Sequence, residues 1–141
     1  MNPEPAIQGA TSPKRRHVVV FADDDPQALL ALERALRHEP YDLHLTTDPR
    51  KALEWVRSRN VSVLVSDYLM PEMCGTTLLE FAMAYSPRTA RILLTGFPGE
   101  HPVRQAREAG LLALSAKPWD DRELRRMIWE RIREREILEG L

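Results

Sequence analysis

Four apolar runs of this chain each end at polar side chains whose types suit the handling of a phosphoryl group. If the runs are parallel strands of one sheet, their carboxyl ends meet at one edge, where open α/β sheets bind ligands. Acids, a hydroxyl and an ammonium gathered at such an edge predict a phosphoryl site. In chain order, the runs and the polar residues that end them are Val18 to Ala22 with Asp23, Asp24 and Asp25; Val61 to Ser66 with Asp67; Ile92 to Leu94 with Thr95; and Leu111 to Ala116 with Lys117.

The adjacent acids need a physical reason, because like charges at short range repel one another. A divalent cation is the simplest one, since magnesium prefers oxygen ligands and is usually held by one or two carboxylates together with phosphate. We therefore expect Asp23, Asp24 and Asp67 to hold Mg²⁺. The alternative is that Asp23 and Asp24 are solvated loop acids. Asp25 stands directly before a proline and is predicted to be a helix N-cap.

Asp67 follows the most hydrophobic run and is the candidate nucleophile, because a carboxylate can take a phosphoryl group to give an aspartyl phosphate. Lys117 and the metal would offset charge on the transferring group, and the Thr95 hydroxyl would hydrogen-bond one of its oxygens. Lys117 is one of three lysines in a chain with seventeen arginines. A lysine offers a compact charge on a flexible stem, whereas the planar fork of an arginine needs more room.

Short apolar runs alternate along the chain with longer segments of helical character. This alternation predicts repeated βα units, a parallel sheet and an α/β fold. Acid-proline pairs at Asp25-Pro26 and Asp48-Pro49 mark the starts of two helices. The five expected strands are His17 to Ala22, Tyr41 to Thr46, Val61 to Ser66, Ala90 to Leu94 and Leu111 to Ser115.

The last predicted helix, from about Asp121 to Glu139, is longer than such a domain needs. Its inward stripe is Leu124, Ile128 and Ile132, and we place Arg135 on the exposed side among other charged residues. Mixed charge of this kind is typical of a solvated face with helical ion pairs. Residues 131–141 are therefore predicted to extend the last helix as a linker or a dimer contact.

Length and composition indicate one domain in a reducing, cytoplasmic setting. The chain has 141 residues, 43% of them hydrophobic, and a net charge of −1, so it carries no overall field for nucleic acid or an anionic membrane. Its single cysteine, Cys74, cannot form an internal disulfide, and no apolar stretch is long enough to span a membrane. Residues 1–16, rich in Pro, Gly, Ser and Thr, are predicted to be a disordered lead-in.

The stretch Val63 to Gly75 resembles the phosphoacceptor segment of two-component response-regulator receiver domains. Met70-Pro71 stands three and four residues after Asp67, and Gly75 stands eight residues after it. Phe21 to Pro26 looks like the acidic segment of the family. Ile92 to Gly96 looks like its switch hydroxyl segment, and Ala116 to Trp119 like its lysine followed by a proline. The resemblance covers about residues 17–130.

The resemblance implies a doubly wound five-stranded parallel sheet in flavodoxin-like order 2-1-3-4-5, with helices on both faces. It implies that Asp67 is phosphorylated by a histidine kinase or a histidine phosphotransfer protein. Asp24 would ligate Mg²⁺ directly, Asp23 through water, and the Leu69 carbonyl would be a further ligand. Lys117 would pair with the phosphoryl group, Thr95 would move toward it, and the Lys117-Pro118 peptide would be cis.

Two departures from the family pattern bear on output and lifetime. Leu114 stands where the family often has a switching aromatic residue, so the usual coupled ring rotation is not available. Leu69 and Phe97 occupy positions similar to those that tune phosphate lifetime in the family. Because apolar side chains cannot orient a hydrolytic water, we expect a long-lived phosphorylated state.

The function expected from these features is a phospho-accepting signalling switch that catalyses only its own phosphorylation and dephosphorylation. Its output protein or effector domain is unknown, and a homodimer is possible. One alternative is a receiver that acts by protein contact without phosphorylation. Another is a phosphatase of the haloacid dehalogenase type, which Asp23-x-Asp25 fits superficially, although Gln27 stands where that family needs a hydroxylated residue.

Overall fold

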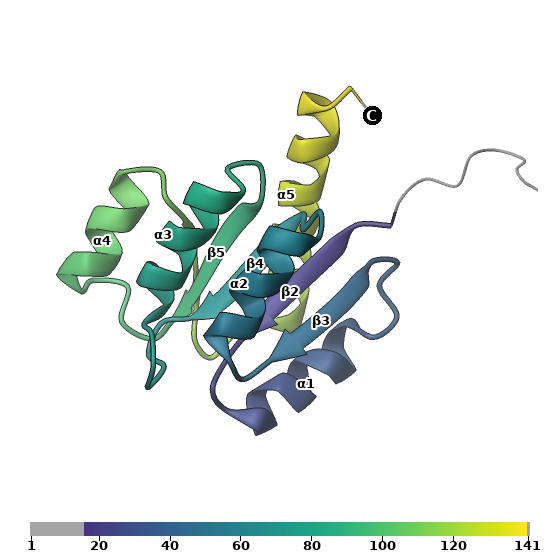
Figure 1. The fold of residues 1–141 in the computed structure, drawn as a ribbon. Helices are drawn as coiled ribbons and strands as arrows, with labels where there is room; N and C mark the ends of the chain where they lie inside the picture. The colour runs from purple at the N-terminus through teal and green to yellow at the C-terminus, as the bar shows by residue number, and fades with distance from the viewer. Residues whose placement is uncertain (1–15, 141) are drawn as a thin grey trace, which may run out of the picture.

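Strands and helices alternate along the whole of residues 16–140, which are the part of the chain that this computed structural model describes (Figure 1). Apart from Arg16, the predicted lead-in lies outside the described residues. The elements are β2 (Val18–Ala22), α1 (Pro26–Leu36), β3 (Asp42–Thr46), α2 (Pro49–Ser58), β4 (Val63–Asp67), α3 (Gly75–Tyr85), β5 (Ala90–Thr95), α4 (His101–Glu108), β6 (Ala113–Ala116) and α5 (Asp121–Leu138).

The strands form one parallel sheet in the order β3-β2-β4-β5-β6. Counted along the chain this is 2-1-3-4-5, so the predicted topology is confirmed. β4 lies at the centre of the sheet, and all five of its residues are buried. In the sheet register Asp67 pairs with Leu94, and Thr95 pairs with Ala116. The residues that end neighbouring strands are therefore brought to one edge.

Helices cover both faces of the sheet, as the doubly wound prediction requires (Figure 1). Side chains of α2, α3 and α4 pack with one face, and those of α1 and α5 pack with the other. Both faces of the central strands are thus buried, which explains why their sequences are almost entirely apolar. The predicted inward stripe of α5 is confirmed, since Leu124, Ile128 and Ile132 are all buried.

Side-chain caps fix where three of the helices begin. Asp25 accepts a hydrogen bond from the Gln27 backbone N–H, so the predicted N-cap of α1 is confirmed. Asp48 caps α2 in the same way, and Asp120 caps α5. An aspartate at this position satisfies one of the backbone N–H groups that a helix start leaves without a partner. The cap at Asp25 also ends the loop that holds the acidic segment.

The start of β6 differs from the prediction, because the expected strand residues Leu111 and Leu112 lie in the connection that follows α4. Gly110 adopts a left-handed backbone with φ of 76°. The Gly110 N–H donates to the Arg107 carbonyl, and the Leu111 N–H donates to the Ala106 carbonyl. This pair of bonds is the Schellman motif that commonly closes a helix. Leu111 is therefore engaged in closing the helix, and the strand begins only at Ala113.

The placement of Arg135 on the exposed side of the last helix is wrong. Its relative exposure is 7%, and its guanidinium lies against the segment that leads into β4. Arg126, another arginine of that predicted face, is exposed and bonds to Glu123 and Glu130 within α5. Among residues 16–140, none of the helices is both long enough and apolar enough to cross a membrane.

Candidate functional site

Asp67 is held at the carboxyl end of β4 with little access to solvent. Its relative exposure is 8%, and its Oδ1 accepts a hydrogen bond of 2.9 Å from the Tyr68 backbone N–H. The same N–H also lies 3.1 Å from the Leu94 carbonyl, which continues the β4–β5 ladder. The Ser66 hydroxyl donates to the Asp67 carbonyl at 2.8 Å. The Tyr68 N–H therefore orients the carboxylate, and the Ser66 hydroxyl holds the Asp67 backbone.

Lys117 brings the opposite charge to this carboxylate from the far side of β5. Its Nζ lies 2.9 Å from Asp67 Oδ1 and 3.3 Å from Asp23 Oδ2, so one ammonium bridges two acids. The Lys117 backbone N–H donates to the Thr95 carbonyl, which extends the β5–β6 pairing to the lysine itself. The peptide bond to Pro118 is cis, as the resemblance implied.

The exposed carboxylate of Asp24 joins those of Asp23 and Asp67 in one acidic cluster. Ligand oxygens of Asp23, Asp24 and Asp67 all lie within 4.8 Å of one another. Asp23 is buried and Asp24 is exposed, so the group opens to solvent on one side. Asp23 Oδ1 accepts the Asp25 N–H at 3.0 Å, which leaves its other oxygen facing Lys117. Clustered carboxylate oxygens with room for water are the donors that Mg²⁺ prefers, so these residues fit that ion.

Burial and charge shift the ionisation of this cluster. Burial raises the pKa of Asp67; the hydrogen bond from Lys117 opposes this shift, and the negative charge of Asp23 adds to it. Burial lowers the pKa of Lys117, but the bond to Asp67 and the charges of both acids outweigh it, so the pKa is raised overall. The lysine therefore stays charged at neutral pH, while Asp67 holds its proton more tightly than an ordinary aspartate.

Thr95 lies at the same edge, but its hydroxyl is bonded to the loop after β5 and not to the acidic cluster. It is buried at the end of β5, and its hydroxyl accepts a hydrogen bond of 2.9 Å from the Phe97 N–H. Within residues 16–140 no hydrogen bond joins this hydroxyl to Asp67 or Lys117. Leu69 and Phe97 each stand two residues after the end of their strand, β4 and β5, and their relative exposures are 54% and 53%. It stays a prediction that Thr95 contacts the phosphoryl group. It likewise stays a prediction that the Leu69 carbonyl is a ligand of Mg²⁺.

Gly75 is part of the site for a steric reason that its place in the motif did not reveal. A Cβ built on Gly75 would lie 2.1 Å from the Asp67 carbonyl oxygen and 2.7 Å from Leu93 Cδ1. The Gly75 N–H also donates to the Tyr68 carbonyl at 2.7 Å. The first turn of α3 thus rests directly on the backbone of the candidate nucleophile, and only glycine leaves room for that approach.

A family model agrees with this geometry. The model of the response regulator receiver domain matches residues 19–129. The chain belongs to this family. Receiver domains are the phospho-accepting switches of two-component systems, and the match covers every residue of the site described above.

Curated relatives and solved structures give the same family. The receiver is 36% identical over 114 residues to the cyclic di-GMP phosphodiesterase response regulator RpfG of Xanthomonas campestris, covering 76% of this chain and 29% of that protein. It is 29% identical over 102 residues to the transcriptional regulatory protein ZraR of Escherichia coli O157:H7, covering 72% of this chain and 23% of that one. The sequence therefore spans less than a third of either relative.

Among solved structures, the signal receiver domain of an HD domain-containing protein from Pseudomonas fluorescens Pf-5 superposes with a TM-score of 0.84 at 31% identity. The superposition covers 92% of this receiver and 96% of that chain. A CheY-like receiver domain from Methanospirillum hungatei JF-1 gives a TM-score of 0.80 at 26% identity. The predicted fold and family are therefore confirmed together.

We predict that Gly75→Ala displaces Asp67 and destabilises the receiver by at least about 2 kcal/mol, because the added methyl group collides with backbone rather than with a flexible side chain. Urea unfolding measures this change. Gly99→Ala is the matched control, since a Cβ there would meet nothing within 4 Å. Equal stability of the two variants would contradict the close packing of Gly75 on Asp67.

A second prediction concerns pH. The pKa of Asp67 is raised in the folded state, so protonation of this carboxyl stabilises the fold. The stabilisation is complete at pH values below the ordinary aspartate pKa of about 3.9, and it is lost as the pH rises through the raised pKa. In a chelating buffer at pH 7, Asp67→Asn should therefore unfold at a higher temperature than wild type. The difference should shrink as the pH is lowered toward 4.

Thermal unfolding with and without Mg²⁺ completes the test. Added Mg²⁺ should raise the unfolding temperature of wild type more than that of Asp67→Asn, because only the former keeps all three carboxylates. Asp42→Asn, which changes an exposed acid at the opposite edge of the sheet, should behave as wild type with Mg²⁺. A lower unfolding temperature of Asp67→Asn in chelator at pH 7 would contradict the assigned direction of the shift.

Proposed function

We propose that this receiver takes a phosphoryl group onto Asp67 from a histidine kinase or a histidine phosphotransfer protein and thereby changes its protein contacts. The observation that carries the proposal is the bridging of Asp67 and Asp23 by the Lys117 ammonium, at 2.9 Å and 3.3 Å, beside a third carboxylate. An acceptor carboxylate, a fixed cation and an acidic metal site are the parts that phosphoryl transfer to aspartate requires.

In the proposed transfer, a carboxylate oxygen of Asp67 attacks phosphorus. An O–P bond forms as the N–P bond of the phosphohistidine breaks, and the electron pair of that bond stays on the histidine nitrogen. Lys117, already within hydrogen-bond distance of Asp67, stabilises negative charge that gathers on the phosphoryl oxygens. Hydrolysis reverses the state, because water attacks phosphorus and the O–P bond to the Asp67 carboxylate breaks.

Asp23, Asp24 and Asp67 are the proposed holders of Mg²⁺, with the Leu69 carbonyl as a further ligand. The ion supplies positive charge beside the phosphoryl oxygens when it is bound. Asp23 shares its second oxygen with Lys117, which fits a role through water, whereas the exposed Asp24 is available for direct ligation. The Thr95 hydroxyl accepts its bond from the Phe97 N–H, so its own hydrogen would be the donor to a phosphoryl oxygen, and the O–H can rotate to make that bond.

The response of the domain is proposed as a shift between two states of α4, β6 and α5. Leu114, in the middle of β6, is half-buried and replaces the usual aromatic side chain, so output would not run through rotation of a ring there. We place the receiver in the cytoplasm with its kinase. Beyond its own phosphorylation and dephosphorylation we propose no enzymatic activity; the family match favours this function over a haloacid dehalogenase-type phosphatase.

The direct test is phosphorylation by a small donor. Incubation of wild type with acetyl phosphate and Mg²⁺ should add the mass of one phosphoryl group, and Asp67→Asn should add none. Asp42→Asn is the control for removal of an acid, because its side chain lies at the opposite edge of the sheet. Lack of modification of wild type would instead favour a receiver that signals by contact alone.

A further prediction concerns the lifetime of the phosphorylated state. Leu69 and Phe97 are the apolar, half-exposed side chains that flank the site, and neither can position a water for attack on phosphorus. Leu69→Asn should therefore shorten the half-life of the phosphorylated protein, measured by timed quench after removal of the donor. Leu30→Asn, which replaces a leucine of similar exposure on α1, should leave the half-life unchanged. A faster loss from wild type than from Leu69→Asn would contradict this account.

A further inference from the structure

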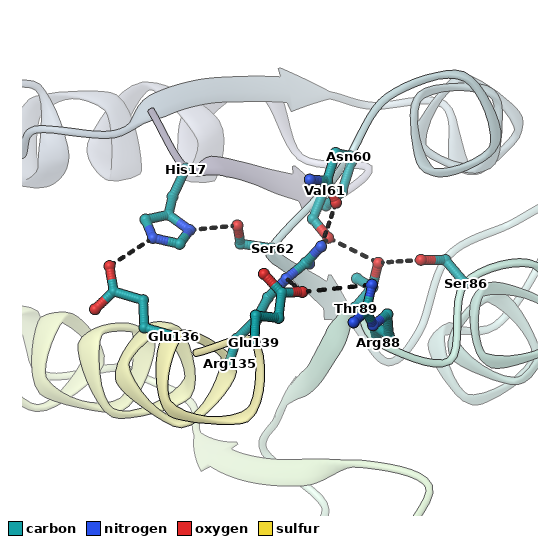
Figure 2. A network of polar contacts seen from close by, with 10 residues as sticks. All are labelled: His17, Asn60, Val61, Ser62, Ser86, Arg88, Thr89, Arg135, Glu136 and Glu139. Atoms are coloured by element: carbon teal, nitrogen blue, oxygen red, sulfur yellow. Dashed lines mark hydrogen bonds and ion pairs between the residues drawn. The ribbon is translucent and has the colours of Figure 1, made fainter. Parts of the chain in front are cut away.

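The last turns of α5 are bonded to the edge of the sheet where the strands begin, opposite the acidic site. Figure 2 shows the side chain of Arg135 reaching from the helix to the segment before β4. Its Nη1 donates to the Val61 carbonyl at 2.6 Å, and its Nη2 donates to the Asn60 side chain. Its Nε donates to Glu139 at 3.0 Å, one turn further along the helix. The buried guanidinium thus uses all three of its nitrogens.

The acceptor on the segment before β4 is itself shared with a third segment. The Val61 carbonyl accepts a second hydrogen bond, of 2.8 Å, from the Thr89 hydroxyl, which lies directly before β5. Ser86, at the end of α3, lies 2.7 Å from that hydroxyl (Figure 2). Since a carbonyl oxygen has two lone pairs, both are occupied. Arg135 therefore joins α5 to the starts of two neighbouring strands through one atom.

Contacts on either side of Arg135 hold the same turns. His17, directly before β2, lies 2.9 Å from Glu136 on α5 and 2.7 Å from the Ser62 hydroxyl before β4. Arg88 lies 3.8 Å from Glu139 (Figure 2). The end of the helix is in this way connected to the segments that precede β2, β4 and β5.

These contacts differ in kind from the ion pairs elsewhere on α5. Pairs such as Arg126 with Glu123 are exposed and lie within the helix, so they add little to stability and do not fix the helix relative to the sheet. Arg135 is buried, and arginine cannot lose its charge in a protein. If α5 slid or frayed at this point, the guanidinium would have to give up its acceptors on the segment that leads into β4. The register of the helix is therefore set at its C-terminal end as well as by its apolar stripe.

We propose that Arg135 is a lock that fixes the last turns of α5 to the starts of β4 and β5, so that residues 131–138 are part of the receiver. The family match ends at residue 129, and the sequence alone predicts that residues 131–141 extend the last helix as a linker or dimer contact. The lock holds the C-terminal end of α5 in a set orientation to β4, the strand that carries Asp67 at its other end. This proposal does not depend on phosphorylation.

Hydrogen exchange on the full chain tests the lock. In wild type, amides of residues 131–138 should exchange no more than about threefold faster than those of residues 124–130. In Arg135→Gln, exchange of residues 131–138 should rise at least tenfold, because the amide side chain cannot reach three acceptors. The amides of Ser62 and Ala90, which pair the starts of the strands, should also lose protection.

Arg133→Gln is the matched control, since Arg133 is an exposed arginine on the same two turns. Its exchange should follow wild type within a factor of two. Equal exchange in Arg135→Gln and Arg133→Gln would overturn the proposal. Should Arg135→Gln fail to fold, the wild-type comparison decides: exchange of residues 131–138 at the rate of an unstructured peptide would overturn the lock, and protection equal to that of residues 124–130 would support it.

Discussion

The arrangement of the site depends on one electrostatic constraint, the placing of a single ammonium between two buried acids. Asp23 and Asp67 end adjacent strands and would repel each other in a region shielded from water. Lys117 offsets that repulsion from the next strand but one, and it reaches the acids because the β5–β6 pairing continues to its own backbone. The parallel register is thus what converts four separate strand ends into one site.

The sequence predicts most of this arrangement because strand ends leave a clear signal. An apolar strand buried on both faces stops where a polar side chain begins, so Asp23, Asp67 and Thr95 are each found within a residue or two of the observed end. The caps at Asp25 and Asp48 are equally local, since each depends on one side chain and its neighbouring N–H groups. Local rules suffice wherever the partner lies nearby in the chain.

Interactions between distant segments are what the sequence does not reveal. Arg135 stands among charged residues of alternating sign and looks like one more member of a solvated face, yet its acceptor is 74 residues away. Gly75 matches a motif, but its contact with the Asp67 carbonyl depends on how α3 folds back on β4. The late start of β6 has a visible signal in Gly110, which closes α4 before the strand can begin.

The central claim is that Asp67 carries the phosphoryl group with Lys117 and a divalent cation beside it. A crystal structure of the receiver with Mg²⁺ and beryllium trifluoride, which mimics a phosphoryl group on a carboxylate, tests it most directly. The account predicts the fluoride complex on Asp67, the metal on Asp24 and Asp67, and Lys117 and Thr95 in contact with fluorine atoms. An unmodified Asp67, or a complex with Lys117 still paired only to the two acids, would contradict it.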